Sequence, residues 1–431
     1  MQGIGRGTPH FPHGSILFHS ATVERRGRRA SFWYSNIKRA FPRLNERGLL
    51  TSRSTDPDTV ADPVAHEFSG KCLVVSQDSK RTFTASSDGT IIIWDTERSA
   101  ILQEWLAHHG PVRGLALSPD GRRLVSAGGM GSGSLTVWNI GSGSDVRKAA
   151  SLEGYTQELT ACTWSPGGTL IASASEDGTM CVWDALTFHQ RDLFELDGWH
   201  TASNLLKYLQ FSPDARYLAW ISKPLPHTLN GSDTCSMWRP LVGERPKKLR
   251  LPSDPSRRDA SINALSFDPE GRRIATAHGS SYRQHEGNVV RISGDVATGA
   301  ALAALAGHTR YVADVSFSPD GRSVLSAAVG VAKIWDAQSW EETASFDLGG
   351  WTDIHWKACF SPGGKHVATA SLYGDSKVQL WRIEDGSCVA AFPEHGRSVE
   401  HVAFSPNGEF LVSGDEGGMV HIRRISSFTQ H

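Results

Sequence analysis

The stretch GHTRYVADVSFSPDGRSVLSAAVGVAKIWD, residues 307–336, contains the pattern that decides the fold. At its centre, Ser318-Pro319-Asp320-Gly321 has the chemistry of a tight turn, because proline presets φ at the second position and glycine accepts the left-handed conformation that follows. Short apolar runs typical of buried strands lie on both sides of the turn, and the last one ends at Trp335. The stretch therefore predicts a β-hairpin followed by a third strand.

The same pattern recurs along the whole chain. Eight landmark turns, two of them degenerate, begin at Ser76, Ser118, Ser165, Ser212, Asp268, Ser318, Ser361 and Ser405. Successive landmarks are 42, 47, 47, 56, 50, 43 and 44 residues apart, close to the period of about 40 to 45 residues at which each repeat supplies four short strands. Proline, glycine and β-branched residues recur too often for helices of ordinary length. The chain is predicted to be all-β.

The residues that flank these turns resemble the WD-repeat family. Tryptophan closes the third strand of most repeats, at Trp94, Trp138, Trp183, Trp238, Trp335 and Trp381. Histidine stands ten residues before the landmark at His66, His108, His308 and His395, and Gly307-His308 keeps the Gly-His dipeptide of the family. The resemblance covers about residues 57–427. It is specific for a fold and not for an activity, because propellers host many unrelated functions.

The resemblance implies a structural role for the matching side chains, since family members often join the histidine, a Ser or Thr, an Asp and the tryptophan in one hydrogen-bonded network. The first repeat keeps the full set as His66, Ser86, Asp88 and Trp94. The other matching residues are Ser175, Asp177 and Trp183 in the third repeat, where Tyr155 takes the histidine position, and His108, Trp138, His308, Trp335 and His395 elsewhere. The sixth repeat has Val329 in place of the Asp, and Ser293 and Arg423 replace tryptophan in the fifth and eighth.

A single four-stranded blade cannot bury both of its faces, so the blades are expected to pack around a channel as a closed β-propeller. We expect eight four-stranded blades, or seven if the fifth or eighth repeat is irregular. The last repeat stops after its third strand near Arg424, and the stretch from Asp58 to Ala65 is positioned to supply the fourth. The predicted domains are a basic N-terminal arm, residues 1–56, and the propeller, residues 57–431.

Charge and composition exclude several classes of protein. The 44 Lys and Arg nearly cancel the 45 Asp and Glu, but residues 1–55 alone carry a net charge of +8, which leaves −9 on the rest. The body is thus unsuited to coating a nucleic acid, which only the arm, with Arg25-Arg26-Gly27-Arg28-Arg29, could contact. No apolar run approaches the ~20 residues of a membrane span. A secretory signal is also missing, so the expected location is cytoplasmic or nuclear.

Catalytic and metal-binding motifs are missing from the sequence. The six cysteines are scattered singly, so we expect no metal and no cofactor. There is no Gly-x-Ser-x-Gly elbow, phosphate-binding loop or His-Glu-x-x-His helix. An enzyme would need a site assembled from separate blades, which motif reading cannot detect.

Long loops in the fourth and fifth repeats indicate where a partner would bind. Insertions occupy residues 223–232, 252–261 and 280–287, and a shorter one occupies 128–134, all on the top face, opposite the landmark turns. Loop growth on a rigid scaffold is where recognition is commonly built, although lengthened loops in decayed repeats can also be drift. The candidate partner-binding residues are Trp199, His200, His227, Arg257, Arg258, Tyr282, Arg283 and His285, aromatic and basic types that suit interfaces.

The sequence therefore predicts a non-catalytic scaffold or adaptor that binds other proteins through the top face and rim of a propeller. One alternative is a substrate receptor of a ubiquitin ligase, many of which carry Trp-Asp-x-Arg. Here Trp94-Asp95-Thr96-Glu97-Arg98 places the arginine one residue late. A second alternative is an RNA-processing or chromatin scaffold that uses the basic arm.

Overall fold

A computed structural model of the chain describes residues 66, 70–131, 133–141, 145–195, 208–222, 234–239, 247–249, 261–279, 288–296, 298–349, 357–371 and 376–429. The predicted arm, residues 1–56, and the predicted closing strand, Asp58 to Ala65, lie outside the described residues. The boundary between arm and propeller therefore stays a prediction.

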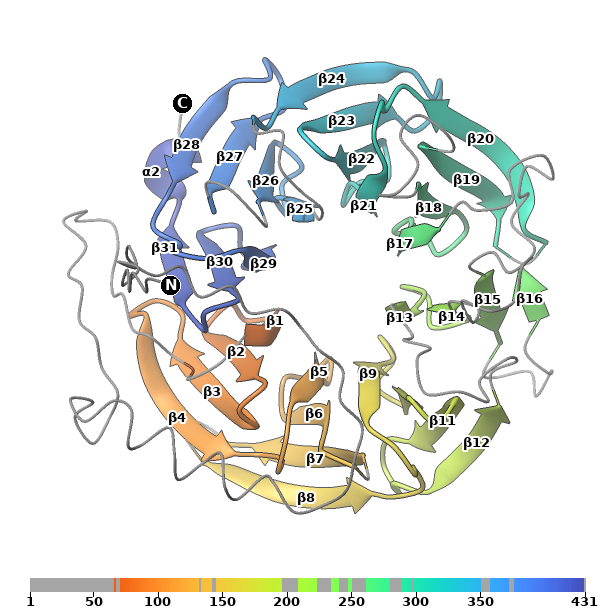
Figure 1. The fold of residues 1–431 in the computed structure, drawn as a ribbon, viewed down its shortest axis with the longest axis vertical. Helices are drawn as coiled ribbons and strands as arrows, with labels where there is room; N and C mark the ends of the chain where they lie inside the picture. Colours follow the sequence, from red (N-terminus) through yellow and green to blue (C-terminus); the bar gives the residue numbers. More distant parts are fainter. Residues whose placement is uncertain are drawn as a thin grey trace, which may run out of the picture. The chain divides into compact units, whose positions relative to one another are not determined.

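Eight small antiparallel sheets form a ring around a central channel (Figure 1). The prediction of an eight-bladed, all-β propeller is confirmed, and the seven-bladed alternative is wrong. Within the described residues seven blades have four strands each, in chain order from the channel outward, and blade 8 has three.

The strands of blades 1 to 4 are β1 (Gly70–Val75), β2 (Arg81–Ser86), β3 (Thr90–Asp95), β4 (Ala100–Leu106), β5 (Val112–Leu117), β6 (Arg123–Gly128), β7 (Ser134–Ile140), β8 (Val146–Leu152), β9 (Leu159–Trp164), β10 (Leu170–Ser175), β11 (Thr179–Asp184), β12 (Gln190–Glu195), β13 (Tyr208–Phe211), β14 (Leu218–Ser222), β15 (Thr234–Trp238) and β16 (Lys247–Leu249). Those of blades 5 to 8 are β17 (Ile262–Phe267), β18 (Ile274–His278), β19 (Val289–Asp295), β20 (Ala300–Ala306), β21 (Val312–Phe317), β22 (Ser323–Ala328), β23 (Val331–Asp336), β24 (Glu342–Asp347), β25 (Lys357–Phe360), β26 (His366–Ala370), β27 (Val378–Arg382), β28 (Cys388–Phe392), β29 (Val399–Phe404), β30 (Phe410–Asp415) and β31 (Val420–Arg424).

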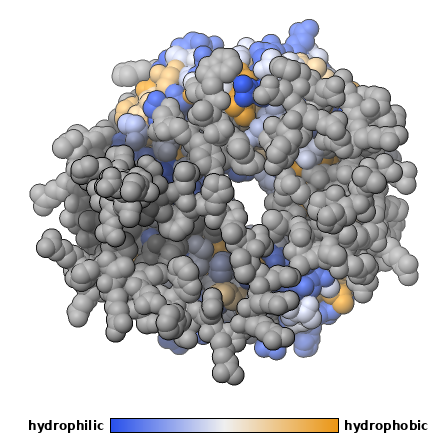
Figure 2. All heavy atoms as spheres, viewed as in Figure 1, coloured by the Kyte–Doolittle hydropathy of each residue, from blue (hydrophilic) through white to orange (hydrophobic). Residues whose placement is uncertain are grey.

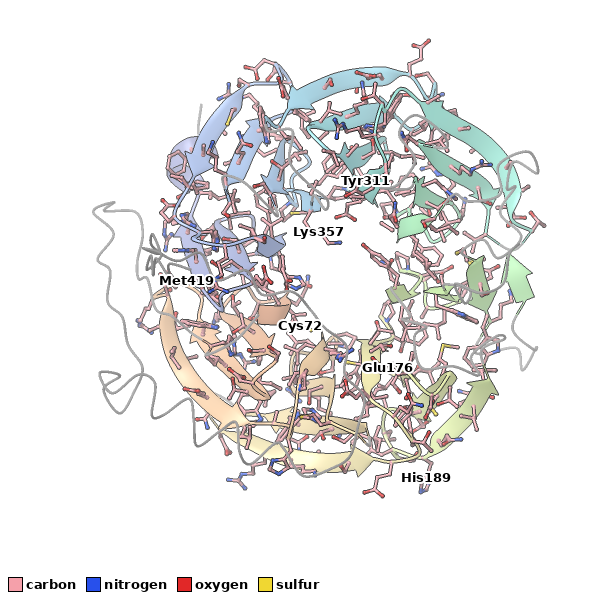
Figure 3. The ribbon with its side chains drawn as sticks, viewed as in Figure 1. Cys72, Glu176, His189, Tyr311, Lys357 and Met419 are labelled. Atoms are coloured by element: carbon pink, nitrogen blue, oxygen red, sulfur yellow. The ribbon has the colours of Figure 1, made fainter. Side chains whose placement is uncertain are left out.

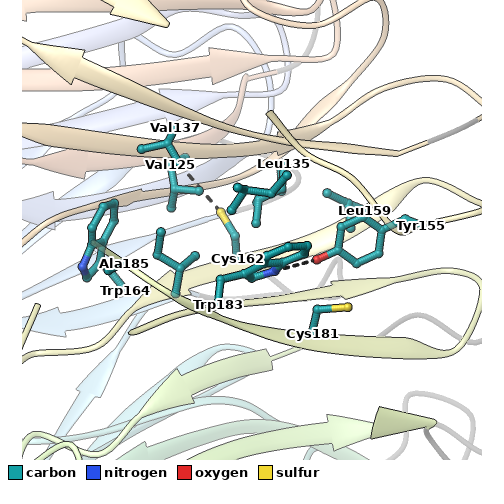
Figure 4. Packing of buried hydrophobic residues seen from close by; sticks show 13 residues of the cluster. Val125, Leu135, Val137, Tyr155, Leu159, Cys162, Trp164, Cys181, Trp183 and Ala185 are labelled. Atoms are coloured by element: carbon teal, nitrogen blue, oxygen red, sulfur yellow. Dashed lines mark hydrogen bonds between the residues drawn. The ribbon is translucent and has the colours of Figure 1, made fainter. Parts of the chain in front are cut away.

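Most residues of the second and third strands are buried, which explains the largely apolar character of these strands. β10, for example, is buried at every residue. Successive blades share their cores: Val125 and Leu135 of blade 2 pack with Ile171 and Trp183 of blade 3 in one cluster (Figure 4). Burial of this apolar area, at about 25 cal/mol per Å², is what holds neighbouring blades together.

The landmark turns have the predicted geometry. In blade 2, the Gly121 amide donates to the Ser118 carbonyl at 2.8 Å, and Gly121 has a φ of 65°. The Ser118 hydroxyl also donates to the Asp120 carboxylate at 2.5 Å. That hydrogen bond lowers the pKa of Asp120 and outweighs the opposing effect of its partial burial. Pro and Gly therefore set the backbone conformation of the turn, while the hydrogen bond between Ser and Asp stabilises it.

The ring closes where blade 8 meets blade 1. Ile92 and Trp94 of blade 1 pack with Val412 and Ile422 of blade 8. At the top of the seam, the His66 amide donates to the Gly418 carbonyl at 3.3 Å, as the His108 amide donates to Gly89 at 3.1 Å one blade on. His66 therefore occupies the same place at the seam as His108 does between blades 1 and 2. The closing strand ahead of His66 stays a prediction.

The tail after β31 packs against blade 7. It forms the short helix α2 (Ser426–Thr429), and the Phe428 ring lies edge-on to the Phe392 ring with 5.8 Å between centroids. The tail therefore covers part of the outer face of blade 7.

Candidate functional site

The hydrogen-bonded network of blade 1 is centred on one buried hydroxyl. Thr84 Oγ1 lies 2.9 Å from His66 Nε2 and accepts a hydrogen bond from Trp94 Nε1 at 3.0 Å. The other ring nitrogen, His66 Nδ1, lies 2.9 Å from Thr90 Oγ1, which donates to Asp88 at 2.5 Å. Burial alone would raise the pKa of Asp88, but hydrogen bonds from His66 and Thr90 bring it down to about 2. The side chains therefore link the second and third strands, and the turn between them, to the entry of the blade.

The bridging hydroxyl is not the one that the sequence suggested. Ser86 and Ser175 were assigned to the networks of blades 1 and 3, but their hydroxyls bond backbone groups near the top turns: Ser86 Oγ accepts from the Asp88 amide, and Ser175 Oγ donates to main-chain carbonyls. Thr84 and Ser173 bridge instead. Residues two apart in a strand share a face, so counting along the strand could not separate the two candidates.

A fixed spacing would have found the bridging residues. Eight residues after each landmark stand Thr84, Ser126, Ser173, Trp220, Thr276, Ser326, Thr369 and Ser413, so seven of the eight positions carry a hydroxyl. Those of blades 2, 6 and 7 accept a hydrogen bond from the indole of Trp138, Trp335 and Trp381, at 2.8, 2.8 and 2.9 Å.

The histidines of blades 2 and 6 are buried beside this hydroxyl. His108 Nε2 lies 2.7 Å from Ser126 Oγ, and its Nδ1 lies 2.8 Å from Ser134 Oγ. Burial lowers the pKa of His108 to about 4 and that of His308 to about 3, helped by Lys148 and Lys333 respectively. Both rings are therefore neutral near pH 7 and have a structural role.

Blade 3 builds the same centre with tyrosine. The Tyr155 and Ser173 hydroxyls are hydrogen-bonded, and Trp183 Nε1 donates to both at 3.1 Å. Figure 4 shows the bond from Trp183 to Tyr155. Asp177 ties the top turn to the chain entering the blade, because it accepts the Thr179 hydroxyl at 2.5 Å and the Thr156 amide at 2.7 Å. Burial of Tyr155 raises its pKa well above the usual value.

Blade 8 has the connectivity of a hydrolytic triad. Ser413 Oγ lies 2.7 Å from His395 Nε2, and His395 Nδ1 lies 3.2 Å from Asp415 Oδ2. A triad requires a nucleophile that substrate can reach, but Ser413, His395 and Asp415 are 1%, 3% and 1% exposed. Arg423 takes the tryptophan position and pairs with Glu394 at 2.7 Å. This group therefore supports packing and cannot receive a substrate.

A hydrogen-bonded link crosses the channel, and no sequence signal pointed to it. Lys357 of blade 7 lies on the channel side of β25 (Figure 3). Its Nζ donates to Tyr208 Oη of blade 4 at 2.8 Å and lies 3.5 Å from Asp314 Oδ2 of blade 6. Burial lowers the pKa of Lys357, but the Asp314 carboxylate and the Tyr208 hydroxyl raise it more, so the ammonium stays charged. Nearer β9, Arg113 pairs with Glu158 and Glu176 at 2.6 and 2.8 Å.

Arginines at the start of second strands join neighbouring blades on the face of the landmark turns. Arg81 donates to the carbonyls of Gly141 and Gly121 at 3.0 and 3.3 Å. Arg123 donates to the Ala185 carbonyl at 2.8 Å. These bonds hold the guanidinium groups in place without neutralising their charge.

An open groove of about 1020 Å³ lies among these arginines, between the landmark turns of blades 2 and 3. We call it the turn-face groove. It is lined by Arg81, Ser118, Pro119, Asp120, Arg122, Arg123, Asn139, Ile140, Gly141, Asp145, Arg147, Trp164, Gly167 and Gly168. Sequence reasoning placed recognition on the opposite face and missed this groove, because its walls come from three blades.

The residues predicted to bind a partner, Trp199, His200, His227, Arg257, Arg258, Tyr282, Arg283 and His285, all lie outside the described residues. Whether they converge stays a prediction. On the face seen in Figure 2, the described side chains in view are largely hydrophilic, with isolated hydrophobic ones between them.

Comparison with known proteins agrees with this geometry. The family described as WD domain, G-beta repeat, matches residues 64–95, 100–139, 147–184, 299–336 and 386–423. The chain belongs to the WD40 repeat family. The matched segments of this WD-repeat protein contain the three inner strands of blades 1, 2, 3, 6 and 8. The inner strands of blades 4 and 5, the repeats with the long insertions, lie between the third and the fourth matched segment.

Its relatives are distant. The chain is 23% identical over 85% of its length to autophagy-related protein 16 of Arabidopsis thaliana, of which the match covers 58%. It is 23% identical over 61% of its length to nuclear distribution protein PAC1 of Arthroderma benhamiae, again covering 58% of that protein. It is 26% identical over 50% of its length to eukaryotic translation initiation factor 3 subunit I of Debaryomyces hansenii, covering 60%. The chain thus spans little more than half the length of these relatives.

Among solved structures, the crystal structure of the computationally designed Ika8 protein superimposes with a TM-score of 0.64 at 23% identity, over 84% of this chain and 98% of that one. This likeness supports the fold alone. Within the described part of this WD-repeat protein, no helix is long and apolar enough to cross a membrane. The same residues contain no group of three His, Cys, Asp or Glu side chains arranged to hold a metal ion.

Proposed function

We propose that this WD-repeat protein is a non-catalytic scaffold that binds other proteins, in the cytoplasm or nucleus, through the loops of its top face and rim. The observation that carries the proposal is the burial of its Ser, His and Asp constellations. Ser413, His395 and Asp415 have the connectivity that nucleophilic catalysis needs, yet all three are under a tenth exposed. A second macromolecule would meet a ring of packed blades that carries loops of unequal length. Recognition is commonly built on loops of a rigid scaffold.

The name of one relative supports assembly with other proteins. One relative is a subunit of a translation initiation factor. The ubiquitin-ligase alternative gains no support, because Arg98 is paired with Asp95 at 2.8 Å within its own turn.

Quantitative affinity purification with mass spectrometry tests the proposal. We expect the full chain to retain a set of proteins, and the triple variant R257A/R258A/Y282A to lose part of that set. Unchanged retention by the triple variant would remove the top-face assignment.

Two further experiments separate the rival functions. Nucleic-acid binding that weakens steeply with salt and disappears on removal of residues 1–55 would favour the RNA or chromatin scaffold. Turnover of any substrate in panels for hydrolases and transferases would argue for an enzyme instead.

A further inference from the structure

The turn-face groove has more positively charged than negatively charged side chains in its lining. Four arginines and two aspartates line it. Asp145 pairs with Arg147 at 3.1 Å, and Asp120 is held by the Ser118 hydroxyl and the Arg122 amide. Within the described residues, no carboxylate forms an ion pair with Arg81, Arg122 or Arg123. The charges of Arg122 and Arg123 contribute to lowering the pKa of Asp120, so the four guanidinium groups and two carboxylates of the groove leave a net charge of +2 that a ligand could neutralise.

Two of these charges are preorganised. Arg81 is fixed by two carbonyls of blade 2, and Arg123 is fixed by the Ala185 carbonyl and lies over the Phe188 ring at 5.3 Å. A side chain already held in place loses little freedom when it binds a ligand. Arg122 is exposed and free to move onto a bound group.

A buried donor without an acceptor lies at the same place. Trp164, the last residue of β9, lines the groove and is 7% exposed. Its Nε1 is buried and, among the described residues, has no hydrogen-bond partner. In Figure 4 the nitrogen edge of this indole points away from the packed cluster around Cys162 and Trp183. Buried polar groups are nearly always satisfied, so an unpaired one marks a place where a ligand can supply the acceptor.

We propose that the turn-face groove binds a short acidic segment, rich in Asp and Glu, of a partner protein. The inference rests on the proposed scaffold function and names the chemistry of one partner. Carboxylates form bidentate hydrogen bonds with guanidinium groups and accept from an indole N–H. A volume of about 1020 Å³ lies at the upper end of the range for ligand sites. A long polyanion such as duplex DNA fits less well, because the chain outside residues 1–55 carries a net charge of −9.

Fluorescence anisotropy with a fluorescein-labelled octapeptide of alternating Asp and Glu tests this site. We expect the full-length protein to bind the peptide, and R122E to weaken binding by about tenfold. W164F, which keeps an aromatic ring but removes the N–H, is expected to weaken it by about threefold. The matched control is R322E, because Arg322 occupies the same turn position in blade 6 and is exposed. Melting temperatures of the variants show whether each one is folded.

The outcomes separate this site from the general function. Absence of peptide binding, equal weakening by R122E and R322E, or tighter binding of inorganic phosphate or an oligothymidylate would each overturn the acidic-peptide site. If protein partners are retained in affinity purification while the peptide test fails, only the groove assignment falls. If no protein is retained and the peptide test also fails, both proposals fall.

Discussion

Blades 2 and 3 are neighbours with the same strand order, and they build the same buried hydrogen-bonded network from different side chains. Blade 2 joins His108 to Trp138 through Ser126, and blade 3 joins Tyr155 to Trp183 through Ser173. In the unfolded chain the His108 side chain titrates near neutral pH, whereas the Tyr155 side chain does not. The difference teaches that the geometry requires a small hydroxyl on the second strand, while the ring that reaches it can change.

Removing the shared hydroxyl should have the largest effect and an unequal one. In Ser126→Ala, the Trp138 indole and His108 Nε2 both lose their partner, so we expect a loss of about 2 to 4 kcal/mol in the free energy of unfolding. In Ser173→Ala, Trp183 Nε1 keeps the Tyr155 hydroxyl at 3.1 Å, and we expect about half that loss. Urea unfolding of both variants measures the difference. Equal losses would show that Tyr155 does not compensate.

Acidification should distinguish the two blades next. Folded His108 stays neutral down to about pH 4, whereas the unfolded side chain binds a proton near 6.5. Unfolding therefore takes up a proton between these values, and stability falls as the pH is lowered from 7 to 5, by about 2 kcal/mol for this residue.

The pH effect is measured by difference, because His278 and His308 also have a lowered pKa, of about 3. Unfolding free energies at pH 7 and pH 5 should differ by about 2 kcal/mol less in His108→Gln than in the wild type. Tyr155→His should increase the pH dependence. A dependence that His108→Gln leaves unchanged would contradict the neutral, buried state of this ring.

The top turn of blade 3 has a carboxylate that blade 2 lacks. Burial alone would raise the pKa of Asp177, but hydrogen bonds from Thr179 and Thr156 have the larger effect and lower it below the usual value. The carboxylate therefore stabilises the fold at any pH above the pKa of the unfolded side chain, and this stabilisation is lost as the pH falls through the pKa of the folded one. Asp177→Asn keeps one acceptor oxygen and should cost about 1 kcal/mol at pH 7. Thermal unfolding at pH 7 measures this loss of stability. An unchanged melting temperature would mean that the turn is held by the main chain alone.

The smallest expected effect concerns the contact between the two blades. Arg123→Lys removes the hydrogen bond to Ala185 and the stacking on Phe188, which should cost about 0.5 to 1 kcal/mol. Arg122→Lys, one residue earlier and exposed, is the control and should cost nothing measurable. If the two variants unfold at the same urea concentration, the contact adds no stability.

Most of the fold could be predicted because the residues that determine each repeat lie close together within that repeat. The Ser118 to Gly121 turn and the apolar strands beside it are local features, and eight copies at regular spacing leave a ring of blades as the way to bury both faces. The candidate site was less predictable. The network residues were found by their offsets, but Ser86 and Thr84 share a face of β2, and only their contacts show which one bridges.

The sequence by itself determined the repeat, its turns and the positions of the buried histidines and tryptophans, because these depend on residues close together in one unit. It left seven or eight blades open, and the ring of eight sheets decided between them. The tertiary structure decided what depends on several units at once. The link from Lys357 to Tyr208 joins blades 7 and 4 across the channel, and the turn-face groove takes its walls from blades 1, 2 and 3. Such groupings follow from how the ring closes, and spacing along the chain does not encode them.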